Sequence, residues 1–169
     1  SIKFIVVGEG KEKNQTIELA RNLKVLDVNL FFLNAISKKE IPLYYKRANL
    51  IINTLVNQRP LWNSSPNKFF DALAVGKPIA INFKGWLAEL IESHECGIVL
   101  DPSDIKHSAI QLSKVLALPL WTEGCGRRAF QLGAEKFERN QLSIKLNEIL
   151  LRVTQSNHDD QAAFRKVSR

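Results

Sequence analysis

Short apolar runs alternate with longer amphipathic segments along this chain, and this alternation limits the fold more than any other feature. The segments between the runs carry apolar residues at helical spacing. Continuous apolar runs separated by helices are typical of a parallel sheet that is covered on both faces. The sequence therefore predicts an α/β fold with helices on both faces of one parallel sheet. The five predicted strands are residues 2–7, 29–33, 49–54, 79–82 and 97–100.

Length and composition predict one folded domain. The chain has 169 residues, of which 45% are hydrophobic, enough to bury a core. We expect residues 1–153 to form this domain, with a helical pattern near its end that breaks at Arg139–Asn140. Residues 154–169 are polar, and we expect them to form a flexible C-terminal tail.

The net charge of +7 narrows the classes of partner. The basic residues are spread along the chain without a run of five, which argues against a nucleic-acid partner. An anionic membrane surface and phosphate-bearing ligands stay open. The cysteines and histidines show no metal-ligand spacing, so we expect no metal. With no signal-peptide pattern and no apolar stretch of about 18 residues, we expect a cytoplasmic protein.

Topology predicts where a ligand binds. In open parallel sheets, ligands lie outside the carboxyl ends of the strands. We therefore expect one crevice there, flanked by Trp62 and Trp86, which could stack on a base or a sugar. The segments expected to surround it follow Val7, Leu33, Thr54 and Asn82.

Residues 64–78 contain the strongest candidate site. Ser64 or Ser65 is predicted to cap a helix, and Pro66 suits its first turn. Free backbone N–H groups and the positive end of a helix dipole form an anion site, to which Lys68 adds a charge. Since many capped helices bind nothing, these residues alone leave both a phosphate site and an ordinary solvated helix open.

Asp71 extends this candidate site by one helical turn. It follows Asn67 by four residues and should therefore lie on the same face of the helix. A carboxylate in this position can accept hydrogen bonds from vicinal hydroxyls such as those of a ribose. The helix is predicted to end at Gly76-Lys77-Pro78.

Residues 63–78 resemble the donor-site signature of the retaining GT-B glycosyltransferases of family 4. In that family two acidic residues with seven positions between them precede an A-x-G-x-P turn, which is Ala74-Val75-Gly76-Lys77-Pro78 here. The form N-K-x-F-D resembles the bacterial capsule and O-antigen branch. Val7-Gly8-Glu9-Gly10 is similar to the G-x-G turn of the family, and the similarity extends in order over residues 2–150.

This resemblance implies a Rossmann-like domain, equivalent to the C-terminal half of a GT-B enzyme, and a role for single residues. Asp71 matches the acidic residue that holds the donor ribose, and Asn63 stands where the first glutamate is usual. An asparagine cannot act as an acid or base, so the catalytic group is unknown. The implied donor-binding residues are Gly8, Gly10, Asn34, Ile36, Ser65, Asn67, Lys68 and Asp71.

The implied reaction is transfer of a hexosyl or N-acetylamino sugar from a nucleoside-diphosphate sugar, expected to be a UDP-sugar. The acceptor would be a polysaccharide or a lipid-linked molecule at the inner face of the plasma membrane. No cofactor is implied. Members of the family bind the acceptor through an N-terminal domain that this chain does not contain, so we expect the chain alone to be inactive. Two alternatives stay open: an enzyme similar to UDP-N-acetylglucosamine 2-epimerase, and a non-catalytic nucleotide-binding module.

Overall fold

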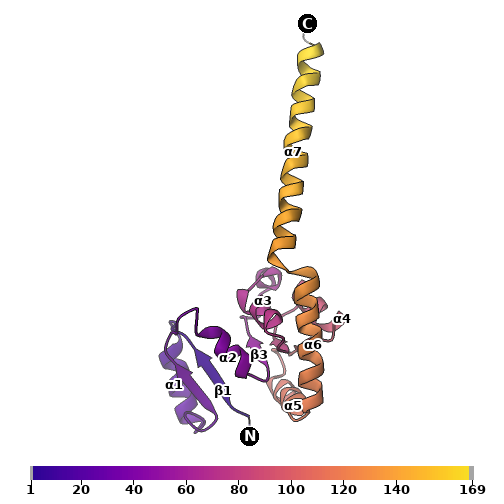
Figure 1. Cartoon of the computed structure of the whole chain (residues 1–169). Coiled ribbons are helices and arrows are strands. Elements are labelled where there is room, and N and C mark those ends of the chain that lie inside the picture. Colours follow the sequence, from indigo (N-terminus) through magenta and orange to yellow (C-terminus); the bar gives the residue numbers. More distant parts are fainter. Residues whose placement is uncertain (1, 168–169) are drawn as a thin grey trace.

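The computed structural model describes residues 2–167, with side chains for residues 2–154. Strands and helices alternate as far as residue 99, and only helices follow (Figure 1). The strands are β1 (Phe4–Val7), β2 (Leu30–Leu33), β3 (Ile51–Asn53), β4 (Ile79–Ile81) and β5 (Gly97–Val99). The helices are α1 (Lys13–Asn22), α2 (Ile41–Arg47), the 3-10 helix η1 (Arg59–Asn63), α3 (Asn67–Ala74), α4 (Trp86–Ser93), α5 (Ile105–Leu116), α6 (Pro119–Lys136) and α7 (Arg139–Val167).

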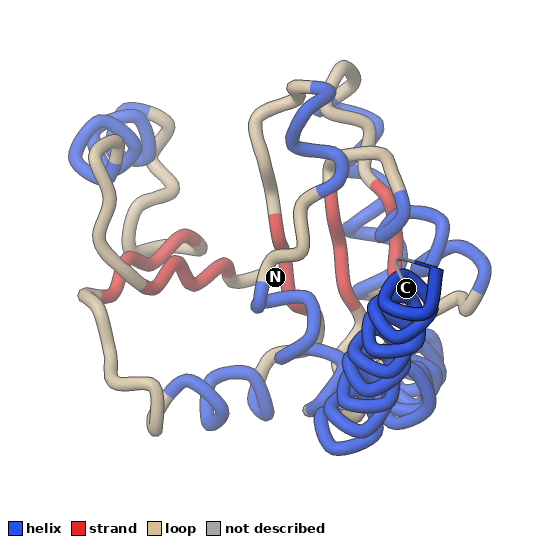
Figure 2. Tube along the Cα trace, turned by 90° about the horizontal axis from the view of Figure 1, so that it is seen from above, coloured by secondary structure: helices blue, strands red, loops and turns tan. Residues whose placement is uncertain are grey.

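The strands form two parallel sheets instead of the single sheet that the sequence predicts. β1 pairs with β2, and β4 lies between β3 and β5 (Figure 2). The predicted α/β class with parallel strands and flanking helices is confirmed. The division into two sheets is a correction: an apolar pattern identifies strands but does not specify which strands pair.

Helices cover both faces of the β3–β5 sheet. Successive side chains of a strand point to opposite faces, so the apolar residues of β4 contribute to two separate clusters. On one face, Ile79 and Ile81 of β4 pack in a buried cluster with residues of α3, α4 and α6. On the other face, Ala80 packs with Leu112 of α5. These three β4 residues have no exposed surface, so the core lies around this strand.

The β1–β2 sheet is much less covered. Ile5 and Val6 of β1 are 58% and 45% exposed, and in α1 only Ala20 is buried. Phe4, at the start of β1, packs against the cluster around Ala80 and so connects this sheet to the rest of the core. The expectation that every strand is covered on both faces is therefore wrong for β1.

The helical pattern near the C-terminus breaks between α6 and α7, close to the predicted position. The carboxylate of Glu138 accepts hydrogen bonds from the backbone N–H groups of Asn140 (3.0 Å) and Gln141 (2.8 Å) and so caps α7. These bonds hold the pKa of Glu138 below its ordinary value.

The helix α7 extends away from the rest of the molecule (Figure 1). It continues past Val153 as far as Val167, so the domain boundary predicted at residue 153 does not coincide with the end of an element. Residues 168–169 of the predicted tail lie outside the described residues. Among the described residues, no helix is long and apolar enough to cross a membrane.

Candidate functional site

The candidate site begins at the N-terminus of α3. Pro66 occupies the N-cap position in an extended conformation, and no side chain caps the helix. The predicted serine caps are wrong: Ser64 is the C-cap of η1, and Ser65 is an exposed residue between the two helices. The carbonyl of Pro66 accepts a hydrogen bond from the N–H of Phe69 (3.0 Å). Since no side chain engages the first N–H groups of α3, they are available to an anion.

The end of α3 follows the prediction. Gly76 adopts a left-handed conformation with φ +65°. Its N–H donates to the carbonyl of Leu73, and the N–H of Lys77 donates to that of Ala72, both at 3.0 Å. This pair of bonds stops the helix and directs the chain into β4 through Pro78.

The polar residues of α3 share its solvent-facing side. Asn67, Lys68 and Asp71 are exposed. Phe69 and Leu73 are fully buried against the core and fix the orientation of the helix. The structure thus places the three predicted donor-binding residues of α3 together on one face at its first turns.

Asp71 also lies beside α2. Burial raises the pKa of the Tyr45 hydroxyl above its ordinary value, and the negative charge of Asp71 adds to this shift. Tyr45 packs against the core from α2 and keeps its proton near neutral pH. The charge of Asp71 thus acts on Tyr45 across the space between α3 and α2.

The loop between β3 and α3 contains η1, which ends at the exposed residue Asn63. Trp62 is half-buried, and its indole Nε1 has no hydrogen-bond partner among the described residues. The Nζ atom of Lys84 lies 5.9 Å from the centre of the Trp62 ring. Trp62 and Lys84 therefore lie near each other at the carboxyl ends of β3 and β4.

Trp86, a candidate for stacking on a ligand, is half-buried and packs against other aromatic side chains. Its ring lies 6.4 Å from those of Phe70 and Phe137 and 6.5 Å from that of Phe69. This aromatic cluster joins α3, α4 and the end of α6. Through this packing, Trp86 supports the first turn of α3.

A second group of predicted residues surrounds the carboxyl ends of β1 and β2. Gly8 has φ +134°, a conformation that favours glycine, and Gly10 is exposed. Lys13 donates hydrogen bonds to the carboxylate of Glu9 (2.8 Å) and to Oδ1 of Asn34 (3.1 Å). The bond from Lys13 holds the pKa of Glu9 below its ordinary value. Lys13 thereby joins the Gly8–Gly10 turn to the loop that contains Asn34 and the half-buried Ile36.

The structure therefore brings the predicted residues together in two groups. Among the described residues, no hydrogen bond or ion pair joins the group at β1–β2 to the group at α3. Three residues near these groups were not predicted as site residues: Lys13, Tyr45 and Asn82. The side-chain amide of Asn82 makes two hydrogen bonds with the backbone of Leu55. Lys13 and Asn82 both lie in segments that follow the end of a strand. This position could have identified them from the sequence.

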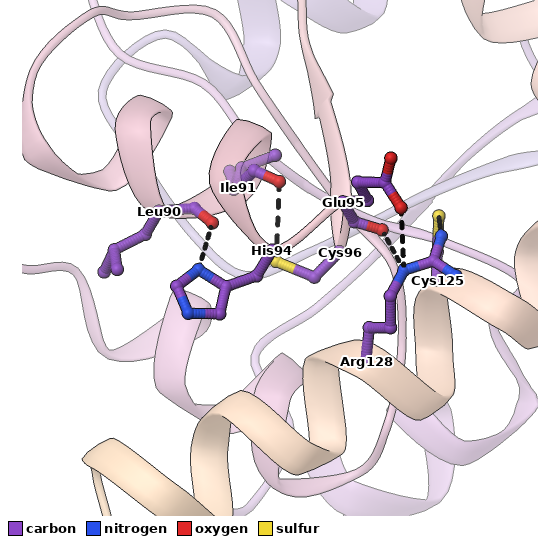
Figure 3. Close-up of polar contacts among 7 residues, drawn as sticks. All are labelled: Leu90, Ile91, His94, Glu95, Cys96, Cys125 and Arg128. Atoms are coloured by element: carbon purple, nitrogen blue, oxygen red, sulfur yellow. Dashed lines mark hydrogen bonds and ion pairs between the residues drawn. The ribbon is translucent and has the colours of Figure 1, made fainter.

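The turn between α4 and β5 contains polar and titratable side chains that were not assigned to the candidate site (Figure 3). Nε of Arg128 donates to the carbonyl of Glu95 (2.9 Å), and Nδ1 of His94 lies 3.1 Å from the carbonyl of Leu90. Cys96 is fully buried, and this burial raises the pKa of its thiol to about 11. These residues are therefore structural. In the described part of the chain, no group of three metal-ligating side chains comes together.

Comparison with known proteins identifies the family. Residues 1–131 match the family described as glycosyl transferases group 1. The chain belongs to this family. It is 25% identical over 150 residues to the alpha-monoglucosyldiacylglycerol synthase of Streptococcus pneumoniae, a match that covers 88% of the chain and 32% of the synthase. The chain thus spans about one third of this group 1 relative.

Solved glycosyltransferase structures share the fold. Sucrose-phosphate synthase from Thermosynechococcus elongatus matches with a TM-score of 0.77 at 18% identity, over 90% of this chain and 38% of that one. The Anabaena protein HepE in complex with UDP-glucose matches with a TM-score of 0.74 at 18% identity, over 89% and 41%. These similarities establish that the chain has the fold of a GT-B glycosyltransferase domain.

Proposed function

We propose that this chain is the donor-binding domain of a glycosyltransferase that moves a sugar from a UDP-sugar to a polysaccharide or lipid-linked acceptor. The observation that supports this most is the exposed polar face at the start of α3. Asn67, Lys68 and Asp71 share this face beside N–H groups that no side chain caps. In a parallel sheet, this helix start lies at the edge where ligands bind.

The chemistry of these groups suits a nucleoside diphosphate. Backbone N–H groups and the helix dipole attract the phosphate oxygens, and Lys68 adds a positive charge. As the bond between sugar and diphosphate breaks, negative charge develops on the departing UDP, and fixed positive groups stabilise it. Asp71 can accept hydrogen bonds from both ribose hydroxyls.

Asn63 limits the chemistry proposed for this domain. Its exposed amide can hydrogen-bond a sugar hydroxyl or acetamido group, but it cannot transfer a proton. We therefore assign it a sugar-holding role and expect no metal or cofactor. The groups at Gly8, Gly10, Asn34 and Ile36 are proposed to contact the nucleoside.

Relatives support the type of donor and acceptor. HepE is described in complexes with UDP and with UDP-glucose, and the Streptococcus pneumoniae relative is named for a glucosylated diacylglycerol. We propose membership of the family 4 branch that builds capsule and O-antigen polysaccharides, with a hexosyl or N-acetylamino sugar as the transferred group. The net charge of +7 fits work at the cytoplasmic face of a membrane that carries anionic lipids.

Titration of the chain with UDP tests the site. Because hydrogen bonds to a charged group contribute about 1.5–3 kcal/mol, Asp71→Ala should weaken binding by roughly tenfold to a hundredfold. Lys68→Ala should weaken it less, and the difference from wild type should shrink at high salt. The exposed residues Glu92 and Lys106 lie on α4 and α5 and provide matched controls as alanine variants. Equal affinity in all five proteins would exclude the proposed site.

A further inference from the structure

Asn82 follows β4 and makes a reciprocal pair of hydrogen bonds with the loop after β3. The backbone N–H of Leu55 donates to its Oδ1 at 2.8 Å, and its Nδ2 donates to the carbonyl of Leu55 at 3.0 Å. Only this orientation of the amide satisfies both groups of Leu55. β3 ends at Asn53 and β4 at Ile81. The side chain therefore takes the place of a backbone peptide group and continues the pairing of the two strands past their ends.

This pair is the main polar attachment of the loop formed by residues 54–65. In the part of the chain that the structure describes, the other hydrogen bonds of this loop are local. Most of its residues are exposed. Leu55 and Trp62 pack against the core, and between them the loop depends on its hydrogen bonds to keep its conformation. The local bonds join Gln58 to Val56, Leu61 to Gln58, and Ser64 to Leu61.

Packing at Gly85 reinforces the same attachment. Gly85 has φ +102°, and a Cβ atom there would collide with the carbonyl oxygen of Trp62. Trp62 therefore approaches the chain after β4 at its backbone, while Lys84 lies over its ring. The segment 82–85 thus holds the loop at two points, Leu55 and Trp62, which lie on either side of its most exposed residues.

We propose that Asn82 is a positioning residue of the donor site, a role that rests on the proposed function. By holding Leu55, it fixes the path of the loop that leads through Asn63 to the start of α3. A loop that is already ordered loses less conformational entropy when a ligand binds. Asn82 therefore strengthens donor binding without contacting the donor.

The test combines UDP titration with amide hydrogen exchange of Asn82→Ala. Loss of both bonds should speed exchange at Leu55 and in residues 56–64, and should weaken UDP binding by about tenfold, which corresponds to about 1.4 kcal/mol. Asn82→Gln carries the same amide on a longer side chain and should regain part of the affinity. Leu112→Ala, which removes core packing under α5, is the control: it should lower stability but leave UDP affinity unchanged.

The outcomes separate the two proposals. If wild-type chain binds UDP and Asn82→Ala binds it equally well, the positioning role is wrong. If Leu112→Ala weakens binding as much as Asn82→Ala does at equal loss of stability, the effect of Asn82 is only structural and the role is again wrong. If the wild-type chain does not bind UDP, the proposed function fails and the role fails with it, while exchange at Leu55 still reports whether Asn82 holds the loop.

Discussion

The two sheets of this chain have the same parallel pairing but different surroundings. In the β3–β5 sheet, Ile79 and Ile81 have no exposed surface, and helices cover both faces. In the β1–β2 sheet, Ile5 and Val6 are about half exposed, and α1 buries a single residue. Strands rich in similar β-branched residues are thus fully buried in one region and half exposed in the other.

This difference shows where the stability of the molecule lies. Apolar burial contributes about 25 cal/mol per Å² of surface removed from water, and most of the fully buried side chains surround β4. The β1–β2 region therefore contributes less and should open at lower free energy. The candidate donor residues fall in both regions. The residues of α3 therefore lie on the more stable part of the molecule, and those after β1 and β2 lie on the less stable part.

The largest expected effect comes from the same substitution made in both sheets. Ile81→Ala removes a fully buried side chain and should lower the free energy of unfolding by about 2–5 kcal/mol. Ile5→Ala acts on a residue that is 58% exposed and should lower it by about 1 kcal/mol or less. Urea denaturation followed by circular dichroism measures both. Equal losses would show that β1 is buried in solution and would remove the contrast between the sheets.

The same contrast shows what the sequence could predict. The order of strands and helices follows from spacing, and the stop of α3 at Gly76 follows from the conformation that glycine permits. Pairing and burial could not be predicted this way: Ile5 has the hydropathy of a core residue, but its side chain is more than half exposed. Likewise, Ser65 is a good capping residue by type, but Pro66 takes the N-cap position instead.

The site was predicted in part for a related reason. A family resemblance assigns residues one at a time, so Asn67, Lys68 and Asp71 were found on their shared face. Asn82 acts through a backbone contact 27 residues away along the chain. No local pattern of residues encodes such a contact, because it exists only after β3 and β4 have paired.

A smaller effect is expected from pH, through Cys96 in the β5 region. Its thiol has a pKa raised from 9.0 to about 11 by burial, so the folded chain retains a proton that the unfolded chain loses. Stability from this group is therefore complete below pH 9 and is lost as pH rises towards about 11. The free energy of unfolding should fall more steeply over this range in wild type than in Cys96→Ala. Parallel pH profiles for the two proteins would show that the thiol is accessible to water.

The smallest effect concerns Glu9 in the β1–β2 region, whose side chain is exposed. Its hydrogen bond from Lys13 lowers the pKa of the carboxyl, so the stability that it contributes is present above the ordinary value of 4.5 and is lost as pH falls. Solvent and salt screen the exposed carboxylate of Glu9, so the loss should be slight. An NMR titration of the Glu9 carboxyl should give a midpoint below 4.5 that returns towards it in Lys13→Met. Since Lys13 also bonds Asn34, the same variant should loosen the Asn34 loop. An unchanged midpoint would mean that Lys13 does not bond Glu9 in solution.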